Sequence, residues 1–321
     1  MSLPCHHLVA LAVVFAALTA ASQSATAQAY PTRAVSLVVG FPQGGPNDIL
    51  ARLMAQWLSA RLGQPFVVDN RPGASGNIAT EAVVRAAPDG YTILLVGPAN
   101  AISASLSDKL SFVFLRDIAA VGAITREALV LVVHPSVPAR DAAGLIALVK
   151  SGTTKLTMAS TGVGSSPHVT GELFKQLAGI DMAVVHYAGG GPALKAMIAA
   201  EAQVMFEPIS AAIGPIKASQ LRALAVTTAA RVAALPGIAA LGESAPGYEA
   251  SAVTGIGVPR NTPAGIIATL NSAINAAFTD PAMTARLADT GGMPLPGTAA
   301  DFARLLAEET AKWGGVVKPK P

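Results

Sequence analysis

The chain has 321 residues, of which 52% are hydrophobic and 13% charged, so it is long enough for two ordinary domains and too apolar for a disordered protein. The net charge of +3 is small, and the lysines and arginines are scattered along the chain. Aromatic residues make up only 5% of the sequence, and none of them interleaves with a basic stripe. We therefore expect no nucleic-acid partner.

The N-terminal segment has the pattern of a secretory signal peptide. Residues 8–21 form an apolar run that is too short for a bilayer core, which needs about 20 residues. Small residues follow, and cleavage near Ala27 or Ala29 fits the pattern. We therefore expect residues 1–29 to be removed on export. The single cysteine, Cys5, precedes the apolar run, so the mature chain would contain no thiol for a disulfide, a nucleophile, a lipid anchor or a metal.

Strand and helix patterns alternate from Val35 to the end of the chain, which is typical of α/β layers. The spacing of apolar residues and the glycines and prolines between the segments predict strands at 35–39, 66–68, 91–96, 118–124, 128–134, 155–159, 183–186, 203–206, 221–227 and 252–258. The same criteria predict helices at 49–62, 78–87, 141–150, 166–178, 192–200, 210–218, 263–278, 281–290 and 298–312.

These elements divide into two lobes of ordinary domain size. Residues 30–124 are expected to form the first part of lobe 1, and residues 125–224 to form lobe 2. The last strand and its three helices exceed what lobe 2 needs, so we place residues 225–321 back on lobe 1. The chain would then cross between the lobes twice, near 118–130 and near 220–228.

A glycine-rich turn, Phe41-Pro-Gln-Gly-Gly-Pro-Asn-Asp48, lies between the first strand and the first helix. We name residues 41–48 the first glycine turn. Gly44 and Gly45 let a ligand approach the main chain, and Asn47 or Asp48 can cap the helix. Backbone N–H groups at a helix start attract a small anion without Lys or Arg. An ordinary strand-to-helix turn uses the same residue types, so both interpretations stay open.

The second glycine turn, residues 160–168, reads Ser-Thr-Gly-Val-Gly-Ser-Ser-Pro-His and also precedes a helix. Its four hydroxyl groups and its backbone amides suit a carboxylate, and Pro167 is typical of a first helical turn. His168 is either a ligand contact or a structural residue that is bonded to a neighbouring carbonyl. Neither turn contains Lys or Arg, so neutral donors and helix dipoles would hold an anion.

A third strand-to-helix turn, Tyr187-Ala-Gly-Gly-Gly-Pro192, points the same way if its strand is parallel. Ligands of open α/β sheets gather at such carboxyl ends of strands. Glu207 follows Val204-Met-Phe206, again at a strand end. Its carboxylate can accept a hydrogen bond from a ligand amine or hydroxyl, or cap the helix that begins near Ser210.

No catalytic template is complete in the sequence. Gly73-Ala-Ser-Gly-Asn77 lacks the final glycine of G-x-S-x-G, and the P-loop, H-E-x-x-H and G-x-G-x-x-G patterns are missing. The mature chain has three histidines, His134, His168 and His186, which are far apart in sequence. The sequence thus predicts no catalytic residue, no metal site and no cofactor.

Several blocks, in their order along the chain, resemble the Bug (TctC-like) solute receptors of tripartite tricarboxylate transporters. The strongest are the first and second glycine turns, joined by Asn70-Arg-Pro-Gly-Ala-Ser-Gly-Asn77, Pro88-Asp-Gly-Tyr91, Leu221-Arg-Ala-Leu-Ala-Val226 and Leu235-Pro236. The similarity runs from Tyr30-Pro31 to about Val317.

The resemblance implies a periplasmic, two-lobed α/β protein of the periplasmic-binding-protein (Venus flytrap) fold, with a mixed sheet flanked by helices in each lobe and crossover strands between them. It implies a monomer that closes on a small carboxylate and delivers it to the membrane subunits of such a transporter. The implied ligand contacts are Phe41, Gln43, Gly44, Gly45, Asn47, Asp48, Asn100, Ser160, Gly162, Gly164, Ser165, Ser166, His168, Tyr187, Gly189 and Glu207.

Two other functions remain open at this point. One is an exported hydrolase that acts on a carboxylate ester, with Ser165 or Ser166 and His168 as its reactive pair, although no base-orienting partner is visible in the sequence. The other is a sensor whose closed form engages a signalling partner, because the same closure would serve transport and sensing.

Overall fold

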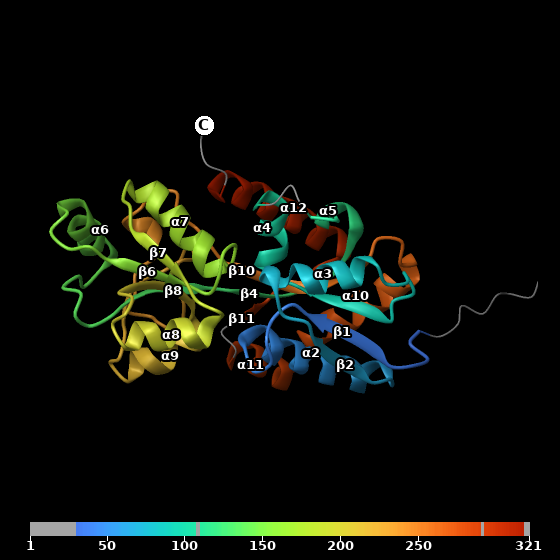
Figure 1. Ribbon diagram of the computed structural model, residues 1–321. Helices are drawn as coiled ribbons and strands as arrows, with labels where there is room; N and C mark the ends of the chain where they lie inside the picture. The colour runs from blue at the N-terminus through green and yellow to red at the C-terminus, as the bar shows by residue number, and fades with distance from the viewer. Residues whose placement is uncertain (1–29, 107–109, 290–291, 318–321) are drawn as a thin grey trace, which may run out of the picture.

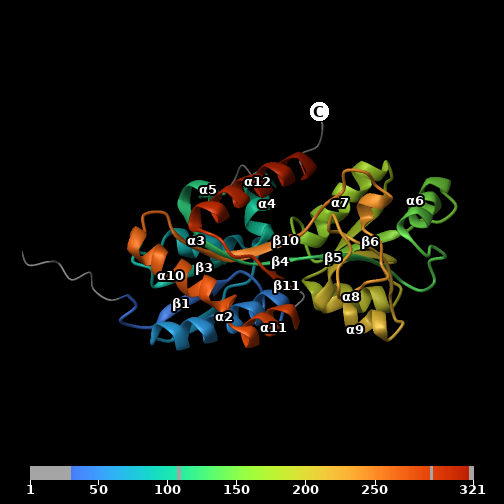
Figure 2. The same cartoon turned by 180° about the vertical axis from the view of Figure 1, so that it is seen from behind.

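The computed structural model describes residues 30–106, 110–289 and 292–317, which form two lobes side by side (Figure 1). Each lobe has its own sheet with helices on both faces (Figure 2). The expected signal peptide, residues 1–29, lies outside the described residues. Within the described ranges, no helix combines the length and the apolar character that a bilayer crossing requires.

The first lobe is built on a six-stranded mixed sheet. From edge to edge its strands are β11 (Gly292–Pro294), β4 (Ile118–Glu127), β10 (Ala252–Pro259), β3 (Thr92–Val96), β1 (Val35–Val39) and β2 (Phe66–Asn70). The strands β1, β2 and β3 are parallel, and β10 is antiparallel to both of its neighbours. Leu37 and Val38 are both buried but belong to different core clusters, because successive side chains of a strand point to opposite faces.

Helices cover both faces of this first sheet. One core cluster joins it to α2 (Pro46–Leu62), α10 (Ala264–Ala277) and α11 (Pro281–Asp289). The opposite cluster joins it to α3 (Asn77–Val84), α5 (Phe114–Asp117) and α12 (Ala299–Val317), and α4 (Pro98–Leu106) packs against α12. Gly63 ends α2 in a left-handed conformation at φ +73°, which costs glycine little. The indole of Trp57 donates to Ala273 O at 2.8 Å and so ties α2 to α10.

The second lobe is built on a five-stranded sheet. In spatial order its strands are β7 (Ala183–His186), β6 (Thr157–Ser160), β8 (Val204–Pro208), β5 (Leu129–Val133) and β9 (Arg222–Val226). The helices α6 (Ala142–Ser151) and α7 (Ser166–Ala178) pack on one face, and α8 (Gly190–Ile198) and α9 (Ile209–Lys217) on the other. The strands β6, β7 and β8 are parallel, which puts the turns that follow them at one edge of the sheet.

The chain passes between the lobes where β4 leads directly into β5, and again before β10. The second passage differs from the expected boundary at 224. Residues 227–250 stay on the second lobe, because Leu241 and Tyr248 are buried in its core and Ala250 N donates to Thr227 O at 2.8 Å. The proline- and glycine-rich stretch carries apolar side chains that pack onto the sheet, so the crossing lies near residue 250.

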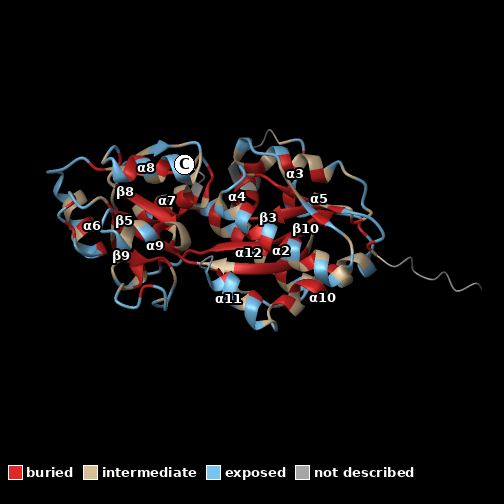
Figure 3. Cartoon of the chain, turned by 90° about the horizontal axis from the view of Figure 1, so that it is seen from below, coloured by how far each residue is buried: buried red, intermediate tan, exposed pale blue. Residues whose placement is uncertain are grey.

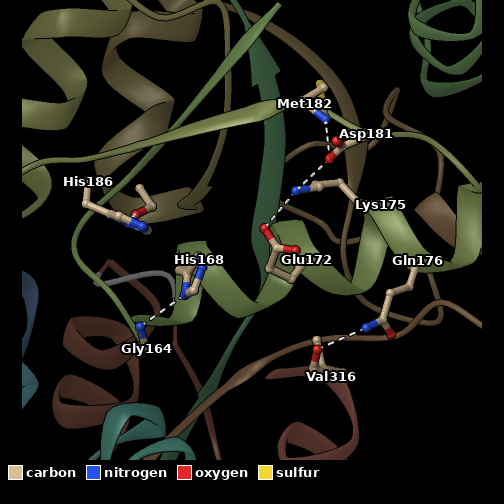
Figure 4. Close-up of polar contacts among 10 residues, drawn as sticks. Gly164, His168, Glu172, Lys175, Gln176, Asp181, Met182, His186 and Val316 are labelled. Carbon is tan, nitrogen blue, oxygen red and sulfur yellow. Dashed lines mark hydrogen bonds and ion pairs between the residues drawn. The ribbon is translucent and has the colours of Figure 1, made fainter. Parts of the chain in front are cut away.

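The two lobes also touch outside the crossing strands. Trp313 and Val316 of α12 join the core of the second lobe, and Gln176 of α7 donates to Val316 O at 2.9 Å (Figure 4). On another side, the hydroxyl of Ser75 donates to Val163 O at 2.6 Å. Figure 3 shows buried residues in both lobes and in the segments that join them.

Most expected elements are present, with ends shifted by at most three residues except in α12, which ends five residues later than expected, and β1, α7 and β7 have the expected bounds. The sequence did not predict α4, α5 or β11. No element is predicted between residues 97 and 117, but Pro98 starts a helix there, since proline is favoured in a first turn. The expected two-lobed α/β fold, with a mixed sheet flanked by helices in each lobe and crossover strands between them, is confirmed.

Candidate ligand-binding site

A cavity of about 370 Å³ lies between the lobes, within the size range of small-molecule sites. The first glycine turn and α4 line it from one lobe, and the turns before α7 and α8 line it from the other. Among the residues expected at the site, those in its lining are Phe41, Gln43, Gly44, Gly45, Asn47, Ser165, Ser166, Gly189 and Glu207. Those outside the lining are Asp48, Asn100, Ser160, Gly162, Gly164, His168 and Tyr187.

The start of α2 is open toward this cavity. Its N-cap residue is Gly45, and no side chain caps the helix. Pro46 has no N–H, so the first donors of the helix are the N–H groups of Asn47 and Asp48. The expected cap by Asn47 or Asp48 is therefore wrong, and the positive end of the helix dipole is left for another anion.

Asp48 instead holds the first glycine turn from behind. Its buried carboxylate accepts from Gly44 N at 2.9 Å and pairs with Arg52, also at 2.9 Å. Burial raises the pKa of this carboxyl, but the hydrogen bonds from Arg52 and Gly44 outweigh it, and the pKa is lowered overall. Gly44 has φ +81°, a left-handed conformation that an L side chain rarely adopts, so Asp48 fixes a turn that needs glycine.

The start of α7 is closed by its own residues. The hydroxyl of Ser165, the N-cap, accepts from His168 N at 3.4 Å. Gly164 N donates to Nδ1 of His168 at 3.0 Å (Figure 4). The second glycine turn therefore satisfies part of its own donor set, and His168 braces it by accepting from a backbone N–H, not by a bond to the carbonyl that the structural interpretation expected.

His168 and His186 form a pair behind the cavity wall. Their rings meet edge to face with centroids 4.8 Å apart, and the buried hydroxyl of Ser160 lies 2.6 Å from Nδ1 of His186. Burial, followed by the neighbouring His186, lowers the pKa of His168, so its ring is neutral near pH 7. Ser160 is fully buried and outside the lining, so this contact supports the fold of the turn.

The start of α8 is open as well. Its N-cap is Gly189 at φ +110°, and no side chain caps it. The strand β7 is parallel to β6, so the third turn points the same way as the second, as its sequence suggested. Gly189 lines the cavity, whereas Tyr187 packs against the apolar cluster beneath α8.

Two carboxyl groups also line the cavity. Glu207 of β8 is only 2% exposed, and its Oε2 atom has no hydrogen-bond partner. Glu127, at the end of β4, accepts from the hydroxyl of Ser210 at 2.6 Å. No side chain caps α9, so the alternative role of Glu207 as its cap is wrong.

Both carboxyl groups are shifted toward their neutral forms. Burial, followed by the nearby Glu127, raises the pKa of Glu207 to about 8. Burial raises the pKa of Glu127 to about 7, against the lowering effect of the Ser210 hydrogen bonds. Glu127 is not among the residues expected at the site, although an acidic residue at the end of a predicted strand is a usable sequence signal.

Asn100 serves α4 and not the cavity. Its buried side-chain oxygen accepts from Gly97 N at 2.7 Å, and its amide donates to Thr80 at 2.8 Å. Pro98 and Ala99 line the cavity in its place. Because α4 starts at Pro98, Asn100 lies behind the cavity wall and is not part of the lining.

A second cavity of about 320 Å³ adjoins the first, since both are lined by Glu127 and Thr254. Asp289 of α11 lines the second cavity. No Lys, Arg or His is among the residues that line either one. Within the described ranges, no group of three or more His, Cys, Asp or Glu side chains is arranged to hold a metal ion.

The protein has two α/β lobes with a cavity between them, and the uncapped start of α2 is part of the cavity lining. This arrangement is that of a periplasmic-binding-protein type of solute receptor. The model of the tripartite tricarboxylate transporter family receptor, TctC, matches residues 50–320. The chain belongs to this family, as its motifs suggested.

Relatives of known sequence and structure agree with this assignment. Protein BugT of Bordetella pertussis is 32% identical over 97% of this chain and 96% of its own length. The structure of R. palustris Rpa4515 with adipate is 34% identical and superposes with a TM-score of 0.84, covering 89% of this chain and 97% of the other. MatC (Rpa3494) from Rhodopseudomonas palustris, with bound malate, is 30% identical with a TM-score of 0.82 over 90% of this chain and 100% of its own.

Proposed function

We propose that the protein is an exported receptor without enzymatic activity, which captures a small organic carboxylate between its lobes and presents it to the membrane subunits of a tripartite tricarboxylate transporter. The observation that carries this proposal is the uncapped start of α2 at the cavity. Two relatives of similar fold hold adipate and malate, both of them carboxylates, which supports the same ligand class here.

The donor set at α2 suits capture followed by release. The N–H groups of Asn47 and Asp48 are neutral, and the helix dipole favours a carboxylate without a buried ion pair. The hydroxyl of Ser166 and the amides before α8 line the same cavity from the second lobe. A ligand that contacts both lobes stabilises the form in which they are together, which is the form a transporter would recognise.

The hydrolase alternative finds no support at Ser165 and His168. Ser165 uses its hydroxyl oxygen to accept from His168 N, and Nδ1 of His168 accepts from Gly164 N. A nucleophilic serine needs a histidine base that a third group orients through its other nitrogen. Here that position is taken by a backbone donor.

The test is binding by the protein purified from the periplasm. Melting temperature and calorimetric titration are measured against mono-, di- and tricarboxylates, amino acids and aromatic acids, after bound ligand has been removed by partial unfolding and refolding. A ligand at 100 times its dissociation constant raises the stability by about 2.7 kcal/mol. One chemical cluster of binding acids supports the proposal, and a panel in which no acid binds contradicts it.

A further inference from the structure

The charges that line the inter-lobe cavities are all acidic. Glu127 and Glu207 line the first cavity, and Glu127 and Asp289 line the second. No lysine, arginine or histidine balances them in either lining. Two nearby arginines have other partners, since Arg52 forms an ion pair with Asp48 and Arg126 donates a hydrogen bond to the hydroxyl of Ser251.

Glu207 carries a buried carboxyl group. Its side chain is 2% exposed, and Oε2 has no hydrogen-bond partner among the described residues. The carboxyl lies against the start of α8, because a β-carbon added at Gly190 would come within 3.4 Å of Oε1. A buried polar group without a partner costs free energy, so a ligand that brings a hydrogen-bond donor to this carboxyl would remove that cost.

The cavity lining therefore combines two kinds of group. The open start of α2 offers N–H donors and the positive end of a helix dipole. The side chains of Glu127 and Glu207 add two carboxyl groups to the same lining. A ligand with a second carboxylate would place that group beside Glu127 and Glu207, where like charges repel unless protons are taken up.

We propose that the ligand carries a cationic group, such as an ammonium, in addition to its carboxylate, and that Glu127 and Glu207 receive this group while the start of α2 receives the carboxylate. The inference rests on the proposed carboxylate-binding function and narrows its substrate class to amino acids and related cationic acids. Ser210, which donates to Glu127 from α9, then holds that carboxylate in place.

The pH behaviour of binding separates an ammonium from a second carboxylate. The titratable and charged groups around the pair are Glu127, Glu207 and, across the second cavity, Asp289. Since the raised pKa values keep the pair partly protonated near pH 7, an ammonium displaces protons when it binds. A dicarboxylate would instead draw protons into the site.

The decisive experiment is a matched panel. Amino acids of four to six carbons, with the amine at the α or ω position, are titrated beside the monocarboxylate and the dicarboxylate of the same chain length. We expect the best amino acid to bind at least tenfold more tightly than both matched acids. Equal or tighter binding of the matched acids overturns this inference and leaves the proposed function standing, whereas no binding by any acid overturns both.

Two variants, and a measurement of the protons exchanged on binding, test whether Glu127 and Glu207 receive the ammonium group. Glu207→Gln and Glu127→Gln should each weaken the best amino acid at least tenfold while the matched monocarboxylate keeps its affinity. Glu249→Gln is the control for the loss of one negative charge, because Glu249 is exposed and lines neither cavity. Calorimetry at pH 7 in buffers of different ionisation enthalpy should show proton release, and proton uptake by the tightest ligand overturns the inference.

Discussion

The two walls of the cavity differ in how the helices that line them begin. Both α2 and α7 follow a strand through a glycine-rich turn with a proline in the first helical turn. At α2 the N-cap is Gly45 and no side chain caps the helix, whereas at α7 the hydroxyl of Ser165 does so. A helix start that its own chain leaves uncapped is the better anion site, so our proposal assigns the ligand carboxylate to the start of α2 and not to that of α7.

A side-chain cap added to the start of α2 should weaken ligand binding more than any other substitution considered below. The substitution Gly45→Asp would put a carboxylate cap on α2, and Gly45 has φ −82°, with Pro42 O as the nearest atom, 3.5 Å from an added β-carbon. We expect acid binding to weaken by about 30-fold or more, which corresponds to about 2 kcal/mol, while the melting temperature is kept or raised.

Gly45→Ala is the matched control, because it adds the same β-carbon without a capping group. Calorimetric titration of both variants with the tightest-binding acid measures the difference. Equal loss in the two variants would mean that crowding, not capping, weakened binding. Retained affinity in Gly45→Asp would remove α2 from the site.

The buried carboxyl group of Glu207 should make the stability of the ligand-free protein depend on pH. The folded pKa of Glu207 is about 8 against an ordinary value of 4.5, so between these values the folded state holds more protons than the unfolded state. The free energy of unfolding therefore falls as the pH rises through this window. Glu207→Gln removes that loss and should stabilise the ligand-free protein by about 2 kcal/mol at pH 8, with no gain at pH 4.

Urea unfolding at pH 4, 6 and 8 measures this effect, with Glu249→Gln as the comparison. A stability gain that is independent of pH would show that the substitution acts through packing. A loss at pH 8 would show that the Glu207 carboxylate has a stabilising partner in solution.

Removing the cap of the closed wall should cost stability more than affinity. Ser165→Ala deletes the hydroxyl that accepts from His168 N and should lower the free energy of unfolding by about 1 kcal/mol. Ser166→Ala, one residue further and not the N-cap, should leave stability almost unchanged. If the two variants unfold alike, the cap contributes nothing measurable.

The contact that joins the walls should have the smallest effect. Ser75 donates to Val163 O at 2.6 Å from the opposite lobe. Ser75→Ala removes a bond worth about 1 kcal/mol and should weaken ligand binding by about threefold to fivefold, mainly through faster release. Stopped-flow measurement of the dissociation rate checks this, and an unchanged rate would show that the bond does not hold the lobes together.

The elements that position the site could be predicted from the sequence because the residues that start and end them lie at their own boundaries. Ser165, Pro167 and the glycine after residue 178 set the bounds of α7 without help from tertiary contacts. The apolar strands were equally legible, since parallel strands buried on both faces are continuous apolar runs. The family resemblance was readable for the same reason, because its blocks are these turns.

The failures came where a side chain had two possible partners. Asp48 is a strong capping residue by type, but its carboxylate turns back to Gly44 N and Arg52. Residues 227–250 were expected to return to lobe 1, yet Leu241 and Tyr248 pack in lobe 2. Glu127 and Glu207 are 80 residues apart in number and meet only because β4 and β8 end at one cavity, which no local pattern encodes.

The most direct test of the central claim is the crystal structure of the protein with its tightest-binding acid. We predict that a carboxylate of the ligand lies within hydrogen-bond distance of the backbone nitrogens of Asn47 and Asp48, and that the ligand also contacts the second lobe. A carboxylate bound at the start of α7, or outside the inter-lobe cavity, with α2 left unoccupied, would contradict it.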